Sequence, residues 1–261
     1  MKILACFKIS RDFEHITPPE LCLLRDGTLD ISFFKKIIGS YDEAALENAR
    51  RLAGEARRGG DCALHAITVG ECEPRFAKEL YAVGFDKVFR ADTQDDNFAP
   101  EVTALTICAH VQKNGGYDAI LTGRQAWPGE SGLTPYIIAN LLSLPCIPHV
   151  THLELCEGKI KAASAVSGGI FTRVIKAPAV YIMDEAAHPY LKVATLREKL
   201  AASDKGLFDL GCLFPESEPQ ISNLSGTQTR LIFDHTEKQC RFIEGASPQE
   251  KAEKLWREVF S

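Results

Sequence analysis

The sequence predicts an α/β fold: a doubly wound, mostly parallel sheet with additional antiparallel strands. As far as Pro145, short apolar runs alternate four times with segments of helical periodicity. This is the pattern of a parallel sheet with right-handed crossovers. After Pro145 the alternation stops, and apolar runs follow one another across a glycine-containing turn. The 261 residues allow one large α/β domain, or one domain with a substantial appendage.

The predicted strands of the first part are near-continuous apolar runs, which are typical of strands buried on both faces. They are Lys2–Ile9, Cys62–Val69, Lys87–Ala91 and Tyr117–Leu121. The predicted helices that follow these strands carry apolar residues at helical spacing. They are Tyr41–Leu52, Glu73–Val83, Pro100–Val111 and Pro135–Leu142.

The expected ends of these helices follow from residues with known capping preferences. Ser40 precedes the first helix as a candidate N-cap, and Gly84 closes the second. Thr134 is a candidate N-cap for the fourth helix, with Pro135 at its first position, where proline is best tolerated. Because Pro135–Leu142 is apolar nearly all round, we expect this helix to be buried.

Hairpin signals occur in two places. Leu21–Phe33 contains two short apolar pieces around Asp26-Gly27, a typical hairpin turn. Beyond Pro145, two strand-like runs flank Glu157-Gly158, and two more follow. We expect these four runs to form added, largely antiparallel strands. They are His149–Cys156, Lys159–Val166, Ile170–Lys176 and Ala179–Met183.

The remainder of the chain has a different character. From Glu185 to Ser225 the periodicity is weak and proline, glycine and serine are frequent, which suits an extended arm better than a core. A strand-like piece, Arg230–Asp234, precedes a predicted helix at Pro248–Val259. We therefore expect an α/β domain over residues 1–184, and an arm with a C-terminal helix that contacts a partner over residues 185–261.

Composition excludes several classes of function. The net charge is −5 and there is no run of lysine and arginine, so we expect no nucleic-acid partner. No segment approaches the ~18 apolar residues of a membrane span, and Met1–Ser10 lacks the apolar core of a signal peptide. Nine cysteines with no CxxC pair indicate small buried side chains in a reducing compartment. We expect a cytoplasmic protein without membrane insertion.

Ligands of such sheets bind beyond the carboxyl ends of the strands, near the point where the strand order reverses. The corresponding loops here are Phe7–Arg11, Ile38–Asp42, Val69–Glu71 and Thr122–Thr134. The last loop contains three glycines and leads into a helix, so its backbone N–H groups and the helix dipole suit a phosphate. An ordinary tight connection between strand and helix explains this loop equally well. The GxGxxG fingerprint is absent at the first strand.

Other site candidates have plainer explanations. Leu133 stands where a serine-hydrolase elbow needs glycine, so Ser131 is not expected to be a nucleophile. His149 and His152 are three residues apart in a strand-like run, hence on opposite faces, and no metal site is expected. Asp42-Glu43 either caps the first helix or binds a ribose, and Trp127 either stacks on a flat ligand or covers the loop.

Four segments, in this order and spacing, resemble the beta subunit of electron transfer flavoproteins. They are ILACFK from Ile3, SYDEAALENARRL at 40–52, AVGFDKVFRAD at 82–92 and LTGRQAWPGESG at 121–132. The resemblance implies an adenine-nucleotide-hydrolase-like fold in a heterodimer with an alpha subunit that holds most of the FAD. It also implies AMP or a second FAD in this chain. Its electron donor would be an acyl-CoA dehydrogenase-like or other flavin dehydrogenase, and this chain would be an electron carrier rather than an enzyme.

The resemblance maps a nucleotide site onto this chain, and Leu191 onto a loop that docks the dehydrogenase partner. No catalytic residue is implied. The implied nucleotide-binding residues are Cys6, Gly39, Ser40, Tyr41, Asp42, Val69, Gly123, Arg124, Gln125, Gly129, Glu130, Ser131, Gly132, Leu133 and Thr134.

The chain departs from the family pattern at the site itself. Gly39-Ser40 stands in place of the usual Asn-Pro, and Leu133 in place of a glutamine. Two other functions of the same fold class therefore stay open. One is an ATP-dependent enzyme, although the loop after the first strand lacks the glycines that grip phosphate. The other is a nucleotide-binding sensor.

Overall fold

The structure is a computed structural model that describes residues 1–12, 33–92, 99–127, 129–175, 178–184, 186–213 and 242–260. Internal contacts divide the chain into two units. The first comprises Met1–Thr17 and Ile31–Gln228, and the second comprises Pro18–Asp30 and Thr229–Ser261. In the described part of the second unit, helix α7 spans Pro248–Phe260, which confirms the predicted C-terminal helix.

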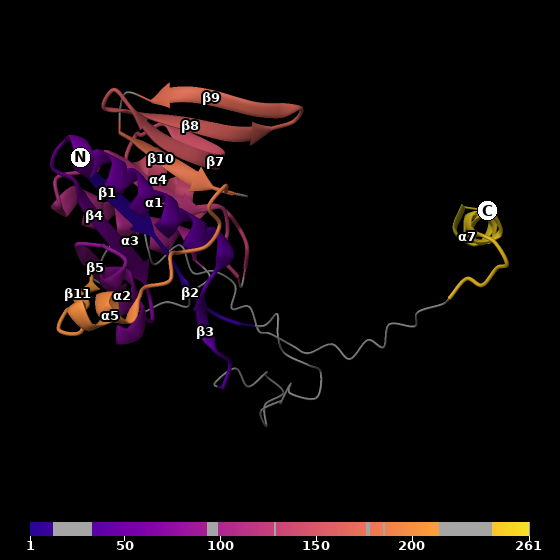
Figure 1. Cartoon of the computed structure of the whole chain (residues 1–261), viewed down its shortest axis with the longest axis horizontal. Coiled ribbons are helices and arrows are strands. Elements are labelled where there is room, and N and C mark those ends of the chain that lie inside the picture. The colour runs from indigo at the N-terminus through magenta and orange to yellow at the C-terminus, as the bar shows by residue number, and fades with distance from the viewer. Residues whose placement is uncertain are drawn as a thin grey trace. The chain divides into compact units, whose positions relative to one another are not determined.

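The first unit is built on a large sheet (Figure 1). Within the described residues it has nine strands in the order β11-β5-β4-β1-β6-β10-β7-β8-β9. All neighbours from β11 to β7 are parallel, whereas β7, β8 and β9 pair antiparallel. The strands are β1 Lys2–Cys6, β4 Ala63–Val69, β5 Lys87–Asp92, β6 Ala119–Gly123, β7 Cys146–Cys156, β8 Lys159–Val166, β9 Gly169–Ile175, β10 Ala179–Met183 and β11 Phe208–Cys212.

Helices cover both faces of this sheet, and a small second sheet stands at its carboxyl end. In the second sheet, β2 Ile9–Arg11 pairs antiparallel with β3 Lys36–Ile38. The helices of the first unit are α1 Ser40–Gly59, α2 Pro74–Ala82, α3 Pro100–Lys113, α4 Thr134–Leu141 and α5 Leu196–Ala201.

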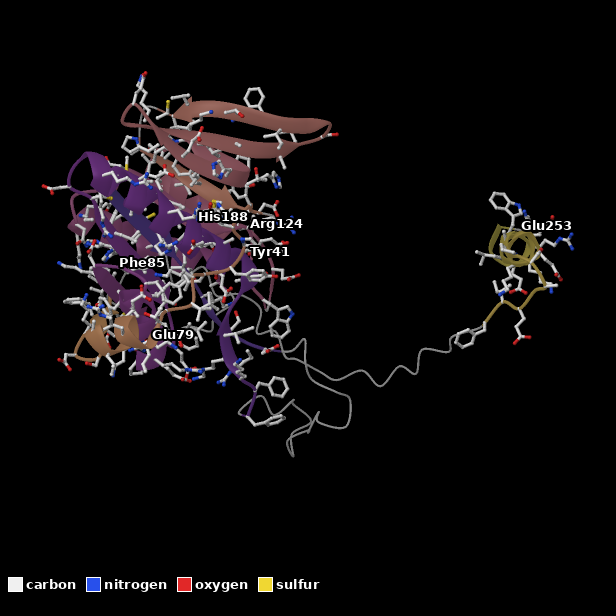
Figure 2. All side chains as sticks on the ribbon, in the orientation of Figure 1. Tyr41, Glu79, Phe85, Arg124, His188 and Glu253 are labelled. Carbon is white, nitrogen blue, oxygen red and sulfur yellow. The ribbon has the colours of Figure 1, made fainter. Side chains whose placement is uncertain are left out.

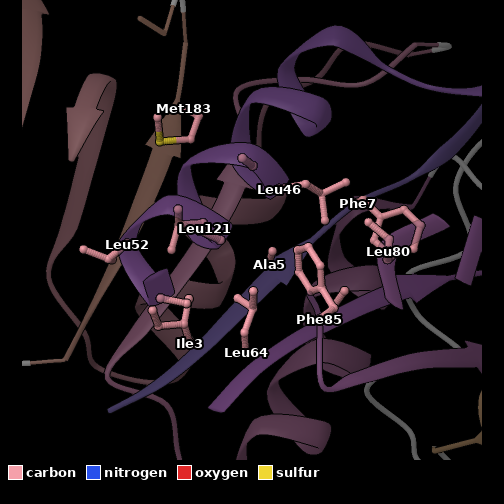
Figure 3. Packing of buried hydrophobic residues seen from close by; sticks show 14 of the residues in the cluster. Ile3, Ala5, Phe7, Leu46, Leu52, Leu64, Leu80, Phe85, Leu121 and Met183 are labelled. Atoms are coloured by element: carbon pink, nitrogen blue, oxygen red, sulfur yellow. The ribbon is translucent and has the colours of Figure 1, made fainter. Parts of the chain in front are cut away.

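The alternation of side chains along β1 shows how the two layers are organised. Ile3 and Ala5 belong to a core cluster shared with α1 and α2 (Figure 3). Leu4 and Cys6 point the other way, into a second cluster shared with α3 and α4. Because both faces of β1 are buried, its apolar run is continuous. The predicted doubly wound α/β fold is confirmed.

Several predicted boundaries need correction. Ser40 and Thr134 are not N-caps, because the cap positions belong to Gly39 and Leu133 and no side chain bonds to the helix there. The first helix continues to Gly59, since Ala53 and Ala56 extend its buried side. The prediction that the fourth helix is wholly buried is also wrong. Only one side of α4 packs on the core; 46% of Tyr136 and 42% of Leu141 are exposed.

Ala179–Met183 was expected among the antiparallel additions, and this was wrong. As β10 it lies parallel between β6 and β7, inside the main sheet. All five of its residues are buried, as an interior strand requires. The β7–β8 and β8–β9 hairpins confirm the antiparallel prediction for the other three runs.

The chain after residue 184 contributes to the first unit. Helix α5 packs beside α2, and β11 pairs with β5 at one edge of the sheet. Thr195 caps α5 by accepting the backbone N–H of Glu198, whose side chain bonds back to the cap. The division at residue 184 stays a prediction. The expected hairpin at Leu21–Phe33, except Phe33, and the expected strand at Arg230–Asp234 lie outside the described residues.

None of the helices in the described ranges combines the length and the apolar character needed to cross a membrane.

Candidate functional site

A cavity of about 620 Å³ opens at the carboxyl end of the sheet. Three segments form it: β2 with the residue after it, the end of β3 with the start of α1, and the connection from β6 into α4. Its volume falls in the ordinary range of small-molecule sites. The lining residues are Ser10, Arg11, Asp12, Ile37, Ile38, Gly39, Ser40, Tyr41, Glu43, Gln125, Ala126, Trp127 and Glu130.

Asp42 joins the strand ends beneath this cavity. Its buried carboxylate accepts the backbone N–H of Lys8, after β1, at 2.8 Å, and that of Gly123, at the end of β6. β1 and β6 are neighbours at the point where the strand order reverses. Burial raises the pKa of Asp42 to about 7, although both N–H donors and the Lys8 ammonium lower it. In this structure the carboxylate ties together the loops that line the cavity.

Two aromatic side chains line the cavity from different elements. Tyr41 comes from the first turn of α1, and Trp127 from the loop after β6. The Ser10 hydroxyl donates to the Trp127 carbonyl oxygen at 2.7 Å, so β2 and this loop are held together. Such ring faces stack on flat heterocycles, at about 1–3 kcal/mol per stacked base.

The charges in the cavity are mainly negative. Asp12, Glu43 and Glu130 contribute carboxylates, whereas Arg11 contributes a guanidinium. Arg11 is also directed to the Phe34 carbonyl oxygen at 3.4 Å and to the Glu71 carboxylate at 3.8 Å. Burial raises the pKa of Glu43, and the N–H that Leu191 donates to it lowers that pKa. Carboxylates accept hydrogen bonds from ligand hydroxyl and amino groups. The lining therefore suits such groups better than it suits several phosphates.

The loop before α4 has a different chemistry. Gly129, Glu130 and Gly132 have positive φ angles of 102°, 43° and 63°. A Cβ on Gly132 would lie 3.2 Å from the Arg124 carbonyl oxygen, so glycine lets the loop fold back on itself. Left-handed residues of this kind turn backbone N–H groups toward anions, and the positive end of α4 follows at Thr134. One phosphate fits this loop.

Arg124 lies next to the cavity but is not among its lining residues. Its guanidinium stacks over the Tyr41 ring at 4.8 Å, and Figure 2 shows the two side chains as neighbours. Arg124 Nη1 lies 3.1 Å and 3.2 Å from the two carboxylate oxygens of Asp184. His149 Nδ1 also bonds to Asp184, at 2.7 Å. Arg124 follows β6, Asp184 follows β10, and His149 lies in β7.

Five residues implied by the resemblance line the cavity directly: Gly39, Ser40, Tyr41, Gln125 and Glu130. Asp42 and Gly123 lie beneath it, and Arg124 lies beside it. The residues Gly129, Ser131, Gly132, Leu133 and Thr134 form the loop into α4. Ligand binding by these residues stays a prediction.

Two implied residues are turned into the core. The Cys6 side chain is buried in the second cluster, and burial raises the pKa of its thiol above the ordinary range. Val69 packs against the same cluster. Their side chains support the sheet, and neither residue is among those that line the cavity.

Sequence reasoning left out several residues that line the cavity. Ser10, Arg11 and Ile38 lay in candidate loops, but Asp12 and Ile37 did not. Ile37 lies in β3 of a two-stranded sheet that was not predicted, and Asp12 directly follows β2 of that sheet. These strands have three residues each, too short for a period of two to stand out. Glu43 was considered together with Asp42 as a helix cap or a ribose ligand, and Ala126 lay in the candidate loop Thr122–Thr134. Both line the cavity, as does Trp127, for which two roles were open.

Leu191 has a different environment from a freely exposed docking residue. Its side chain is partly buried and packs against the first core cluster. Its neighbours Tyr190, Val193 and Leu196 are the strongly exposed apolar residues of this segment. Docking by Leu191 stays a prediction, and these neighbours belong to the same surface.

In the described ranges, no group of three or more histidine, cysteine, aspartate or glutamate residues is arranged to hold a metal ion. His149 is committed to Asp184, and the His152 ring lies 6.3 Å from that of His188.

Comparison with known proteins agrees with this architecture. The electron transfer flavoprotein domain matches residues 34–203. A protein of Escherichia coli K12, provisionally named electron transfer flavoprotein subunit YgcR, is 27% identical over 99% of this chain and 97% of its own length. The electron transfer flavoprotein subunit beta of Bacillus subtilis is 28% identical over 78% and 80%. The acryloyl-CoA reductase electron transfer subunit gamma of Anaerotignum propionicum is 26% identical over 92% and 90%.

Proposed function

The chain belongs to the electron transfer flavoprotein family, and on this premise we propose that it is a beta-type subunit working as a heterodimer with an alpha subunit. In this proposal the alpha subunit holds most of the FAD. This chain binds an adenine nucleotide, either AMP or a second FAD. The pair moves electrons from a flavin dehydrogenase to an acceptor, and the setting is the cytoplasm.

The cavity at the carboxyl end of the sheet carries this proposal. It joins two aromatic faces, from Tyr41 and Trp127, to three carboxylates and a loop of left-handed residues. An adenine ring suits the aromatic faces, ribose hydroxyls suit the carboxylates, and a phosphate suits the loop from Gly129 to Gly132. The residues present therefore fit an adenosine with one phosphate.

Flavin, when bound, supplies the group that takes up and gives away electrons. The residues of this chain orient the bound nucleotide and shield it from water. Asp42 fixes the loops around the nucleotide through the N–H groups of Lys8 and Gly123. Ser10 fixes the position of Trp127 through its carbonyl oxygen. No residue of this chain needs to act as a nucleophile, acid or base in such a carrier.

An uncovered strand supports a partner subunit. In β9, six of the seven residues are exposed, including Ile170, Phe171 and Val174. This strand lies at the margin of the sheet, beyond the helices (Figure 1). An exposed apolar edge strand invites association, and natural proteins cover or charge such edges. We assign the alpha subunit to this face, because the relatives are named as subunits.

The segment from Tyr190 to Leu200 is the proposed docking surface for the dehydrogenase. It exposes Val193 and Leu196 beside the partly buried Leu191. The donor in this proposal is an acyl-CoA dehydrogenase-like enzyme or another flavin dehydrogenase. A separate surface for the donor leaves the β9 face to the alpha subunit.

The deciding experiment counts bound nucleotides. The chain is co-expressed with a candidate alpha subunit, the purified complex is denatured, and flavin and AMP are measured by absorbance and chromatography. One FAD with one AMP per heterodimer is the expected result for a one-flavin carrier. Two FAD without AMP indicate a carrier with two flavins. Absence of both, with no complex formed, would overturn the proposal in favour of a nucleotide-binding sensor, and ATP turnover would favour an enzyme.

A further inference from the structure

Asp184 is the centre of a charged cluster at the carboxyl end of three adjacent strands. Its side chain is 9% exposed, and it follows the last residue of β10. Arg124, after β6, approaches both of its oxygens at 3.1 Å and 3.2 Å. His149, in β7, bonds to Oδ2 through Nδ1 at 2.7 Å. A carboxylate can only accept, so Nδ1 carries the proton in this bond.

The backbone is bent to make this cluster. His149 has a φ of +52°, a left-handed conformation that is rare for residues with a side chain. β7 carries one more residue than β10 between the pairs Tyr181–Ile147 and Val150–Met183. A bulge of this kind re-aims the side chains next to it. Here it accompanies the contact between the imidazole and Asp184, which indicates that the contact has a purpose beyond sheet packing.

Arg124 is held tightly but incompletely satisfied. Its guanidinium is shared between Asp184 and the face of Tyr41, and Tyr41 in turn lines the cavity. Arg124 Nε is buried and has no hydrogen-bond partner among the described residues. A guanidinium in this state has donors left for a phosphate if Asp184 releases it.

Because the cavity is mainly negative, the position of Arg124 decides whether a second phosphate can be accommodated. Of the cavity's lining residues, Arg11 is cationic, whereas Asp12, Glu43 and Glu130 carry carboxylates. A single phosphate can accept hydrogen bonds from the backbone N–H groups of the loop that begins at Gly129. A second phosphate would find no comparable loop of N–H donors among the lining residues, and it would add negative charge beside those carboxylates. Arg124, which stacks on the cavity-lining Tyr41, is a cation close enough to offset it.

We propose that Asp184, positioned by His149, is a specificity-determining residue that holds Arg124 outside the cavity. Of the two occupants left open above, it thereby selects AMP, with one phosphate, over FAD, with two. The inference rests on the proposed nucleotide-binding function and adds to it the residues that select between one phosphate and two.

The test uses the purified heterodimer, depleted of AMP, with AMP and ADP as probes in isothermal titration calorimetry. In Asp184→Asn the side chain keeps its size and loses its charge, so Arg124 is released toward the cavity. The affinity for ADP relative to AMP is expected to rise roughly tenfold, the value of one charge-assisted hydrogen bond. His149→Ala, which only loosens Asp184, is expected to give a smaller rise in the same direction. This variant decides the matter if Asp184→Asn does not fold.

A double variant provides the matched control. In Asp184→Asn with Arg124→Gln, the gain in affinity for ADP relative to AMP is expected to disappear. An unchanged ratio in both Asp184→Asn and His149→Ala would overturn the role of Asp184, and so would a gain that persists without Arg124. Failure of the unmodified heterodimer to bind AMP is a different result, because it overturns the nucleotide-binding function itself.

Discussion

The carboxylate of Asp42 occupies the space that a side chain on residue 123 would need. A Cβ built on Gly123 would lie 2.4 Å from Asp42 Oδ1 and 2.8 Å from the Tyr41 carbonyl carbon. Asp42 receives the N–H groups of Gly123 and Lys8, so this close approach fastens β6, β1 and the first turn of α1 together. The cavity depends on that junction, because the segments that line it adjoin the junction: β2 follows β1, the connection from β3 ends at α1, and the connection into α4 starts at β6.

Gly123→Ala is expected to destabilise the chain by about 1–3 kcal/mol, the usual cost of overpacking, and to weaken AMP binding. The methyl group can be placed only if the end of β6 moves away from α1. Urea unfolding gives the stability, and calorimetry gives the affinity.

Gly54→Ala is the matched control for this substitution. Gly54 lies inside α1, and a Cβ added there would meet no atom within 4 Å. Alanine at this position is expected to stabilise the chain by about 0.5–1 kcal/mol and leave nucleotide binding unchanged. Equal stability of the two variants would contradict the role assigned to the Gly123 junction.

Trp127 is expected to report nucleotide binding directly. The chain has two tryptophans, so Trp256→Phe leaves Trp127 as the single indole of this subunit. Stacking of adenine on this ring should quench its fluorescence when AMP is added. Trp127→Ala should weaken AMP binding by about 1–3 kcal/mol, the usual value for one stacked base. Unaltered affinity in Trp127→Ala would show that the indole only covers the loop.

Acidification is expected to destabilise the chain through two buried histidines. The Tyr117 hydroxyl bonds to His65 Nδ1 at 2.9 Å and to His110 Nε2 at 3.1 Å. Burial lowers the pKa of each histidine to about 4. Each unfolded histidine binds its proton near pH 6.5, so the unfolded state takes up more protons between pH 6.5 and 4. Stability is therefore fully present above pH 6.5 and is lost as the pH falls toward 4.

The measurement is the free energy of unfolding in urea at several pH values from 7.5 to 4.5. Replacing His110 by glutamine removes one of the two titrating groups, so the loss between pH 6.5 and 4.5 should become smaller in His110→Gln. A pH dependence that is identical in both proteins would rule out this origin of acid sensitivity.

The uncovered β9 strand is expected to decide assembly with the alpha subunit. Ile170 and Val174 lie on the same face of this strand, and both are more than half exposed. Placing charge there, as Ile170→Lys with Val174→Lys, should weaken the heterodimer at least tenfold, because the charges would be buried without partners. Size-exclusion chromatography of the co-expressed subunits over a dilution series measures this.

Val193→Lys is the matched control for this surface. It makes the same kind of change at a still more exposed apolar residue in the proposed docking segment. The heterodimer should stay intact in this variant, whereas electron transfer from the dehydrogenase should slow. If Val193→Lys dissociates the heterodimer and the β9 changes do not, the assignment is reversed: the docking segment would bind the alpha subunit, and the β9 face would bind the dehydrogenase.

Local patterns predicted part of this structure well. The apolar strand ending at Val69 and the turn at Glu157-Gly158 have short-range signals, and each forms the expected element. The strand predicted over Lys2–Ile9 forms β1 only as far as Cys6, and Ile9 begins β2 of the small sheet. The loop from Gly123 to Thr134 was identified as a site candidate from its glycines and the helix behind it. Part of that loop, around Gln125 and Trp127, does line the cavity.

Long-range pairing was beyond local patterns. AVYIM at Ala179–Met183 is equally suited to a parallel or an antiparallel strand, and only its neighbours β6 and β7 decide between them. Ile9–Arg11 and Lys36–Ile38 are too short to show a period, yet their pairing supplies one wall of the cavity. The cluster of Asp184, Arg124 and His149 joins residues from three separate strands.

The amino-acid sequence by itself determined the α/β alternation, the edge of the sheet at which the cavity opens, and the family to which the chain belongs. These properties follow from residue spacing and from turn residues, which act over a few positions. Only the tertiary structure decided where β10 lies, that Asp42 lies beneath the cavity, and that Asp184 holds Arg124 beside it. Each depends on side chains that meet across strands, and that distance is set by how the whole sheet packs.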